Sequence, residues 1–121
     1  MDRVRFIDHR GTPILLADLS GITETPELQR VVRLGTELLH AQPPHSTLVL
    51  VDLSYVEYNL ESFAIVQQSV AVNRPFVRAR AIVGLPGIAE VPFQIVAKLS
   101  ERPMAHFETR EEAQEWLVTQ P

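Results

Sequence analysis

Cysteine is absent from the 121-residue sequence, and lysine occurs only once. The absence of cysteine excludes a disulfide framework, a thiolate nucleophile and zinc sites built on sulfur ligands. No apolar stretch approaches the roughly 20 residues that a membrane-spanning helix needs. The first residues, Met1–Phe6, also lack the apolar core of a secretory signal. We therefore expect a soluble, cytoplasmic protein with no membrane span.

Positive charge is also scarce. Lysine and arginine together number 11 against 15 aspartate and glutamate residues, so the formal net charge is −4. A dedicated nucleic-acid-binding protein needs a net positive potential, so nucleic acid is not an expected partner. Hydrophobic residues make up 45% of the chain, which suits a folded domain rather than a disordered one. A chain of this length predicts a single domain over residues 1–121.

Proline and glycine divide the sequence into short regular segments. Two apolar stretches, 4–7 and 14–17, lie on either side of a turn-rich segment and predict a β-hairpin. After the hairpin, stretches with apolar residues at helical spacing alternate with short apolar runs. The predicted helices begin near Thr25, Asn59, Pro92 and Thr109, and the strands between them are 48–51, 81–83 and 104–107.

The alternation of strands and helices requires crossover connections, which predict a mainly parallel sheet. Residues 48–51 (Leu-Val-Leu-Val) are continuously apolar, a pattern typical of a central strand covered on both faces. The fold class that we predict is α/β. It consists of a mixed five-stranded sheet, with an N-terminal antiparallel hairpin followed by parallel strands, and four helices.

Local signals predict how these helices begin and which faces they bury. Thr25 is positioned to cap the first helix. Thr109 and Glu112 have the spacing of a capping box at the start of the last helix. In that helix Trp116 falls on the apolar face, and we expect its side chain to be substantially buried. The buried face of the third predicted helix comprises Phe93, Val96 and Leu99.

Two aspartates follow predicted strands, Asp18 after the second and Asp52 after the third. Ligands of open α/β sheets bind beyond the carboxyl ends of strands, and two acids there could hold magnesium. A phosphoryl-receiver domain, which uses such a pair, also needs a lysine at the end of a late strand. The one lysine, Lys98, falls inside a predicted helix. We therefore favour capping or solvation of both carboxylates over a metal site.

Other signals of catalysis or metal binding are sparse. His40 and His45 lie on either side of two prolines, which form a rigid loop rather than a helical metal-binding pair. The sequence contains no Gly-x-Ser-x-Gly nucleophile motif and no Walker-type phosphate loop. Because no nucleophile, base and metal constellation is present, we expect a protein without catalytic activity, metal or cofactor.

Two loops carry weak ligand signals. Gly84 and Gly87 lie between a predicted strand and the third predicted helix, where backbone amides could hold an anion. The tight turn of such a corner explains the same glycines. Arg74, Arg78 and Arg80 surround an aromatic residue, a combination that can bind single-stranded nucleic acid. In an acidic protein we instead expect these arginines to form a solvated connection between helix and strand.

The connection after the third predicted strand is the segment richest in recognition groups. It clusters hydroxyl, amide and aromatic side chains near a helix N-terminus, where free amides and the helix dipole would stabilise a phosphate. This mixture is also typical of recognition surfaces. From the residues alone a structural explanation is favoured, with Asn59 capping the helix and Tyr55 and Tyr58 packing. The candidate interaction residues are Asp52, Ser54, Tyr58, Asn59 and Ser62.

A family resemblance rests on five segments in this order and spacing: Ile14–Gly21, Ala41–Pro44, Asn73–Val77, Ala81–Gly84 and Phe107–Leu117. Together they resemble small bacterial proteins of the STAS family, which are similar to anti-sigma-factor antagonists. More narrowly, the chain resembles the stand-alone branch often grouped with CRAL-TRIO-type lipid-binding domains. The resemblance covers almost the whole chain. It implies a STAS-like sheet with packed helices and a non-catalytic role in regulation through protein contacts.

The resemblance also bears on phosphorylation. Antagonists that switch by phosphorylation carry Asp-Ser-Ser/Thr-Gly at the third-strand corner. Here the corresponding stretch, 60–63, reads Leu-Glu-Ser-Phe, which retains Ser62 but lacks the aspartate and the glycine. Glu61 beside this serine would also repel an added phosphate. We therefore expect binding at this corner without a phosphorylation switch.

Two functions from different classes follow from the sequence. The first is a regulatory interaction module that binds another protein, with a homodimer as one form that it could take. The second is a binder of a small apolar ligand, such as a lipid, at the edge of the sheet. The residues themselves do not decide between the two.

Overall fold

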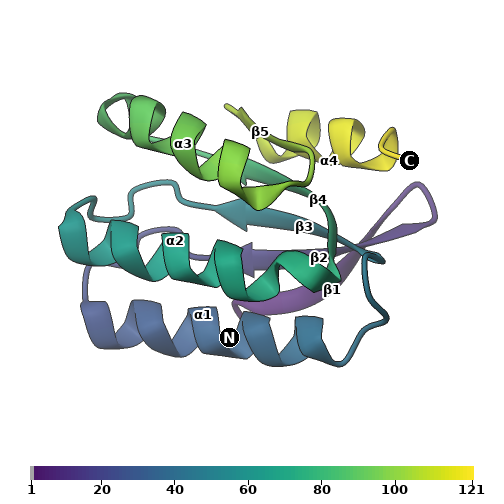
Figure 1. Ribbon diagram of the computed structural model, residues 1–121, viewed down its shortest axis with the longest axis horizontal. Coiled ribbons are helices and arrows are strands. Elements are labelled where there is room, and N and C mark those ends of the chain that lie inside the picture. Colours follow the sequence, from purple (N-terminus) through teal and green to yellow (C-terminus); the bar gives the residue numbers. More distant parts are fainter. Residues whose placement is uncertain (1) are drawn as a thin grey trace.

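The computed structural model describes residues 2–121, so Met1, which the single-domain prediction includes, lies outside the described residues. Its centre is a five-stranded sheet in the order β1-β2-β3-β4-β5 (Figure 1). β1 pairs antiparallel with β2, and each later neighbouring pair is parallel, so the predicted mixed sheet is confirmed. The strands are β1 (Val4–His9), β2 (Thr12–Asp18), β3 (Thr47–Asp52), β4 (Val77–Val83) and β5 (Met104–Phe107).

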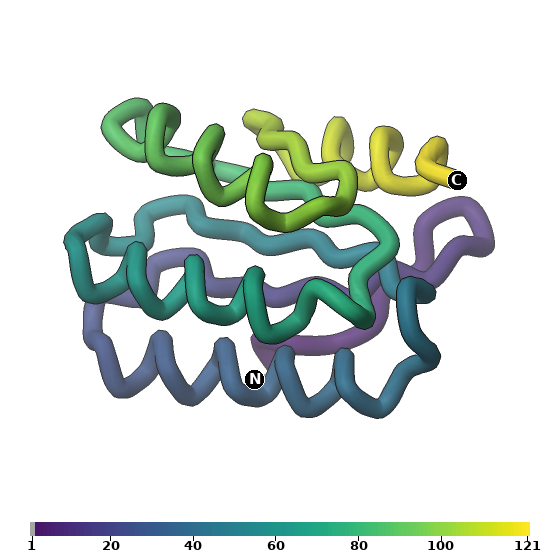
Figure 2. The backbone as a smooth tube through the Cα atoms, viewed as in Figure 1, coloured from purple at the N-terminus to yellow at the C-terminus, as the bar shows by residue number. Residues whose placement is uncertain are grey.

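Helices cover both faces of the sheet (Figure 2). Because the parallel strands follow one another in a single direction, right-handed crossovers place the three connecting helices on the same face. The four predicted helices are confirmed, and within residues 2–121 none is long and apolar enough to cross a membrane. They are α1 (Thr25–His40), α2 (Leu60–Asn73), α3 (Glu90–Ser100) and α4 (Arg110–Val118), with 3₁₀ turns η1 (Arg74–Phe76) and η2 (Gly87–Ala89).

Alternate residues of the strands pack against the two helical layers. Ala79 of β4 belongs to the core cluster that contains Leu117 of α4. Leu15 of β2 faces the other way and clusters with Leu39 of α1. The stretch Thr47–Leu50 of β3 is buried throughout. This confirms the prediction of a central strand, because β3 lies in the middle of the sheet with helices on both faces.

The starts of two helices differ from their predictions. Glu24, not Thr25, is the N-cap of α1, and it makes no side-chain capping bond. Thr25 is instead the first residue inside the helix, and its hydroxyl donates to the Glu61 carboxylate. At α4 the Thr109 hydroxyl accepts the Glu112 amide at 3.2 Å, as predicted. The Glu112 carboxylate accepts that same hydroxyl at 3.1 Å rather than the Thr109 amide, so the capping box is only half formed.

Two predictions of burial are partly wrong. Val96 of α3 faces the sheet, but Leu99 is 55% exposed. Ser100, four residues after Val96, takes the buried position because a helix repeats every 3.6 residues. Trp116 is only partly buried. It packs at the rim of the α4 core, with its ring centre 5.5 Å from that of Phe107.

The prediction of a solvated arginine connection is wrong for Arg80. Arg74 lies in η1 and pairs with Glu101 at 3.1 Å on the surface. Arg80, by contrast, is only 5% exposed. The physical reason is that β4 begins at Val77 rather than at residue 81, so Arg80 is an internal strand residue. Its side chain lies on the face of the sheet covered by α1 and α2.

Candidate interaction site

The candidate corner lies at the carboxyl edge of the parallel strands. The connections from β2, β3 and β4 to their helices run along this edge, at the left of Figure 1. Backbone hydrogen bonds join these connections to one another. The Gly21 amide donates to the Ser54 carbonyl at 2.8 Å, and the Glu57 amide donates to the Ile22 carbonyl at 3.2 Å. The edge is therefore one continuous, mutually supported surface.

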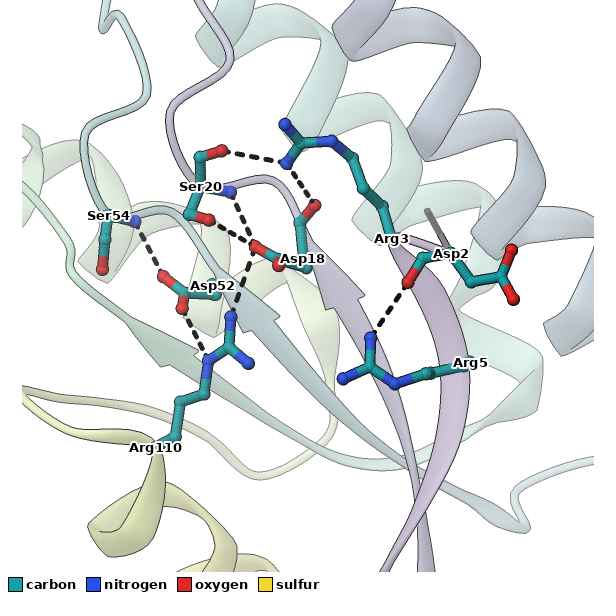
Figure 3. A network of polar contacts seen from close by, with 8 residues as sticks. All are labelled: Asp2, Arg3, Arg5, Asp18, Ser20, Asp52, Ser54 and Arg110. Atoms are coloured by element: carbon teal, nitrogen blue, oxygen red, sulfur yellow. Dashed lines mark hydrogen bonds and ion pairs between the residues drawn. The ribbon is translucent and has the colours of Figure 1, made fainter.

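An arginine bridge ties β2, β3 and α4 together at this edge (Figure 3). Arg110, the first residue of α4, donates from Nε to Asp52 Oδ2 at 2.7 Å. Its Nη2 atom lies 3.3 Å from Asp18 Oδ1. Each aspartate also accepts a backbone amide two residues further on, that of Ser20 at 3.0 Å and that of Ser54 at 2.9 Å. Both carboxylates therefore cap a turn and pair with the same cation.

The bridge shifts the ionisation of its members. Burial acts to raise the pKa of Asp18, but hydrogen bonds from Ser20 and the charge of Arg110 outweigh it and hold the pKa below its ordinary value. Burial acts to lower the pKa of Arg110, but its bonds to Asp52 and Asp18 outweigh that effect and raise it. The guanidinium thus occupies the place between the two acids where a metal cation was considered.

The two aspartates are structural groups at this edge. Capping, the interpretation that the sequence favours, is present at both Asp18 and Asp52, whereas the bridge to Arg110 was missed. Arg110 is 58 residues from Asp52, and no local spacing rule connects residues that far apart. Among the described residues, no three His, Asp or Glu side chains are grouped as metal ligands.

Ser62, the residue that matches the regulatory serine, is engaged in the cap of α2. The Asn59 side chain accepts the Ser62 amide at 2.8 Å, and the Ser62 hydroxyl accepts the Asn59 amide at 3.0 Å. Ser62 is 7% exposed. A phosphate on this hydroxyl would break the cap and bring a charge into a buried position, which is costly. These contacts support the expectation that this corner has no phosphorylation switch.

The structure divides the five predicted interaction residues. Asp52 and Ser62 are 5% and 7% exposed, because the bridge and the cap draw them inward, and their contact with a partner stays a prediction. Ser54 and Tyr58 are partly buried, and the Tyr58 ring packs edge-on against Phe63. Asn59 is exposed as a residue, while its side-chain oxygen caps α2.

The accessible side chains at this corner are two that the prediction left out. Tyr55 and Leu60 are each 89% exposed. Tyr55 was expected to pack, but its backbone adopts a left-handed conformation, with φ of 62°, and directs the ring away from the core. Leu60 is the first residue of α2. An apolar residue in the first turn of a helix is a weak signal in sequence, because nothing local shows which way it points.

A second group of exposed apolar residues lies on η2 and α3. Ile88, Val91, Ile95 and Leu99 are 76%, 73%, 56% and 55% exposed. Val91, Ile95 and Leu99 are four residues apart and lie on one side of α3, and Ile88 precedes them in η2; we call these four residues the α3 patch. The sequence contains two apolar rows on this helix. Because both have helical spacing, periodicity does not decide which row packs on the sheet and which meets solvent.

An apolar cavity of about 60 Å³ lies beneath the corner, between α2 and α3. It brings the β3–α2 connection, represented by Leu53 and Tyr58, against the β4–α3 connection, represented by Leu85 and Pro86. Met104 of the edge strand β5 also contributes to its wall. The two connections that carry the exposed apolar residues are therefore neighbours in space.

The loop at Gly84 has a packing explanation. Gly84 has φ of 75°, and an added Cβ would lie 2.7 Å from the Ser54 Cα, so only glycine fits where the two connections cross. Its amide donates to the Phe107 carbonyl at 3.3 Å. This hydrogen bond occupies the amide, so the amide is not free to bind an anion. Gly87, in η2, has open space around its Cα. The anion-loop prediction is therefore unnecessary to explain Gly84.

The histidines lie at the opposite edge of the sheet or on its last strand. His40 stacks on Phe76, with ring centres 4.3 Å apart, and its Nε2 lies 3.1 Å from the Asn73 side-chain oxygen. His45 hydrogen-bonds Arg102. His106 packs edge-on against a phenylalanine of α3. These contacts give the rings of His40, His45 and His106 a structural role.

Comparison of the chain with family models and with curated proteins found no match. Among solved structures, the chain is similar to an uncharacterized protein from the DUF3478 family, with a SpoIIAA-like fold, from Shewanella loihica PV-4. The TM-score is 0.75 over 94% of this chain and 91% of that chain, at 14% sequence identity. At this identity the likeness shows the fold alone. The SpoIIAA-like fold is that of STAS domains and anti-sigma antagonists, so the predicted resemblance is confirmed at the level of the fold.

Proposed function

We propose that the protein is a non-catalytic interaction module that binds a protein partner, another protein or a second copy of itself, through the α3 patch together with Tyr55 and Leu60. The observation that carries this proposal is the exposure of these six apolar side chains, each more than half accessible, in adjoining segments. Isolated exposed apolar residues are ordinary, but a contiguous group marks an interaction surface.

The surroundings of this surface support the proposal. The Arg110 bridge and the close contact of Gly84 with Ser54 hold the connections in place. Recognition groups on loops are effective when a rigid scaffold positions them. The SpoIIAA-like fold agrees with a role in protein contacts, and this role is the one that the family resemblance implies.

Substitution of the exposed patch tests the proposal. Val91→Asp places a charge in the middle of the patch, where burial under a partner would be unfavourable. The protein and the variant are compared by sedimentation velocity for self-association and by capture of partners from host-cell lysate. We expect the variant to lose the complex that the unmodified protein forms, while its far-UV circular dichroism stays the same.

Leu34→Asp is the matched control. Leu34 is 40% exposed on α1, at a distance in the fold from α3, and should keep the complex. If Val91→Asp and Leu60→Asp both retain the complex as well as Leu34→Asp does, the contact surface lies elsewhere.

A second candidate function is favoured by the cavity between α2 and α3. Its apolar wall would suit a small apolar ligand near the edge strand, in agreement with the alternative predicted from sequence. With a volume of about 60 Å³, the cavity is well below the roughly 300–1,000 Å³ of typical ligand pockets, so a lipid would require α2 and α3 to move apart. Native mass spectrometry of freshly purified protein tests this alternative, which predicts a retained small-molecule mass.

A further inference from the structure

Arg80 is a buried charge for which the described residues provide no partner. It lies inside β4, where its backbone pairs with Val49 of β3 and Met104 of β5. Within residues 2–121 no charged or hydrogen-bonding group shifts the pKa of its guanidinium, whose nitrogen atoms keep some accessible surface. Fully buried arginines in proteins are normally paired, because an isolated charge in a low-dielectric interior is unfavourable. Burial lowers the pKa of Arg80 to about 10, so the group is still a cation at neutral pH.

The Arg80 side chain lines a partly open space rather than packed atoms. A cavity of about 50 Å³ lies between the sheet and the helices α1 and α2, with Arg80 in its wall. Valine, leucine and isoleucine side chains form most of the remaining wall. Its polar side chains are Thr36, Ser69 and Asn73, and no acidic residue of the described chain contributes to it.

The polar side chains of this cavity have unused hydrogen-bond donors. Asn73 donates one amide hydrogen to Thr36 Oγ1 at 3.2 Å, which leaves its second amide hydrogen available. Among the described contacts of Thr36, its hydroxyl acts only as an acceptor. The Arg80 cation and two available donors, the Asn73 amide and the Thr36 hydroxyl, therefore line a space that is otherwise mostly apolar. This arrangement is complementary to an anion.

The cavity adjoins a surface groove. Helices α1 and α2 run side by side in front of the sheet (Figures 1 and 2). A groove of about 260 Å³ runs between them, and it shares Val32, Thr36 and Ser69 with the cavity below. Ile65 and Val72 add apolar surface to the groove, and its one charged residue among the described residues is Arg33. A ligand could therefore place a charged head in the cavity and an apolar tail in the groove.

We propose that the space between α1, α2 and the sheet binds a short aliphatic carboxylate, with its carboxylate on the Arg80 guanidinium and its tail between α1 and α2. A guanidinium matches a carboxylate through two parallel hydrogen bonds. A phosphate dianion would need further positive charge, and the cavity wall supplies a single cation. This site contains no residue of the α3 patch. An experiment that rejects one of the two proposals therefore leaves the other untouched.

A homologous ligand series tests this site. Sodium acetate, butyrate, hexanoate and octanoate are titrated by isothermal calorimetry and by thermal shift, with 1-hexanol and inorganic phosphate as comparison compounds. We expect one or more of the carboxylates to bind and to raise the melting temperature, with a dependence on chain length. The alcohol lacks the charge and phosphate lacks the tail, so neither should have the effect.

Two variants identify Arg80 as the anchor. Arg80→Met removes the charge while keeping an apolar chain of similar length, and we expect it to weaken carboxylate binding on the order of tenfold to a hundredfold, the value of a hydrogen bond to a charged group. Arg78→Met is the matched control, since Arg78 lies on the same strand but not in the cavity wall, and it should bind as the unmodified protein does. Because Arg80→Met removes an unpaired charge, it should remain folded.

Three outcomes would overturn the proposal: no carboxylate of the series binds at millimolar concentration, 1-hexanol or phosphate stabilises the protein as well as the acids do, or Arg80→Met binds them unchanged. The α3-patch variant Val91→Asp should bind carboxylate normally, which separates a failure at this site from a failure of the proposed protein contact.

Discussion

Arg110 and Arg80 stand in opposite electrostatic surroundings. Arg110 reaches two carboxylates at the carboxyl edge, those of Asp52 at 2.7 Å and Asp18 at 3.3 Å. Arg80, which is more deeply buried, reaches none within the described part of the chain. The difference teaches that burial alone does not define the role of a charged residue. The charge of Arg110 is neutralised by two carboxylates and stabilises the fold. The charge of Arg80 has no neutralising carboxylate among the described residues.

The largest effect is expected where the Arg110 edge is packed most tightly. Gly84→Ala should destabilise the protein by about 3 kcal/mol, because alanine is strained at positive φ and its Cβ would collide with Ser54. Urea denaturation measures the change. Gly87→Ala, which meets open space, should stay within about 0.5 kcal/mol. Equal effects at the two glycines would mean that the edge is looser than its contacts imply.

Removing the Arg110 cation should have the next largest effect. Arg110→Met leaves the buried carboxylate of Asp52 without its cation, which should cost about 2 kcal/mol, below the 3–5 of a fully buried pair because Arg110 is partly exposed. The exposed Arg30, which pairs with Glu27 at 2.8 Å, is the control. Arg30→Met should change stability far less than Arg110→Met does, because solvent screens the exposed pair. The comparison breaks down if both substitutions cost the same.

Arg80→Met should act in the opposite direction. Replacing an unpaired buried charge by an apolar side chain of similar length should stabilise the ligand-free protein by about 1 kcal/mol, measured in the same urea titration. A clear loss of stability would show instead that the guanidinium has a stabilising partner inside the protein. Arg110→Met and Arg80→Met therefore form a pair of substitutions of opposite sign.

The smallest effect concerns acid stability on the Arg110 side. The pKa of Asp18 is lowered in the folded state, so its contribution is present above the unfolded pKa of about 4 and is lost as the pH falls through the folded value. Asp18→Asn should therefore make the stability less dependent on pH below about 5. Stability measured from pH 5 down to pH 2 tests this. An unchanged slope would show that Asp18 gains nothing from Ser20 and Arg110.

Parts of the candidate site follow from local sequence. Asn59 was predicted to cap α2 and does so, because a cap depends on residues only three positions apart. The missing aspartate and glycine beside Ser62 pointed away from a phosphorylation switch, and the buried cap agrees. The same local logic does not show exposure. Tyr55 and Leu60 were therefore missed, since their accessibility depends on which neighbouring connections leave them uncovered.

The sequence by itself determined the type and order of the elements, because turn residues and apolar periodicity act over a few residues. The continuous apolar run of β3 also indicated its central place. Only the tertiary structure decided which charges meet. Whether Arg80 lies in solvent or under α1 and α2 depends on where β4 begins, and side chains alternate between the two faces of a strand. Arg110 meets Asp52 across 58 residues of sequence, because folding brings together groups that no local pattern connects.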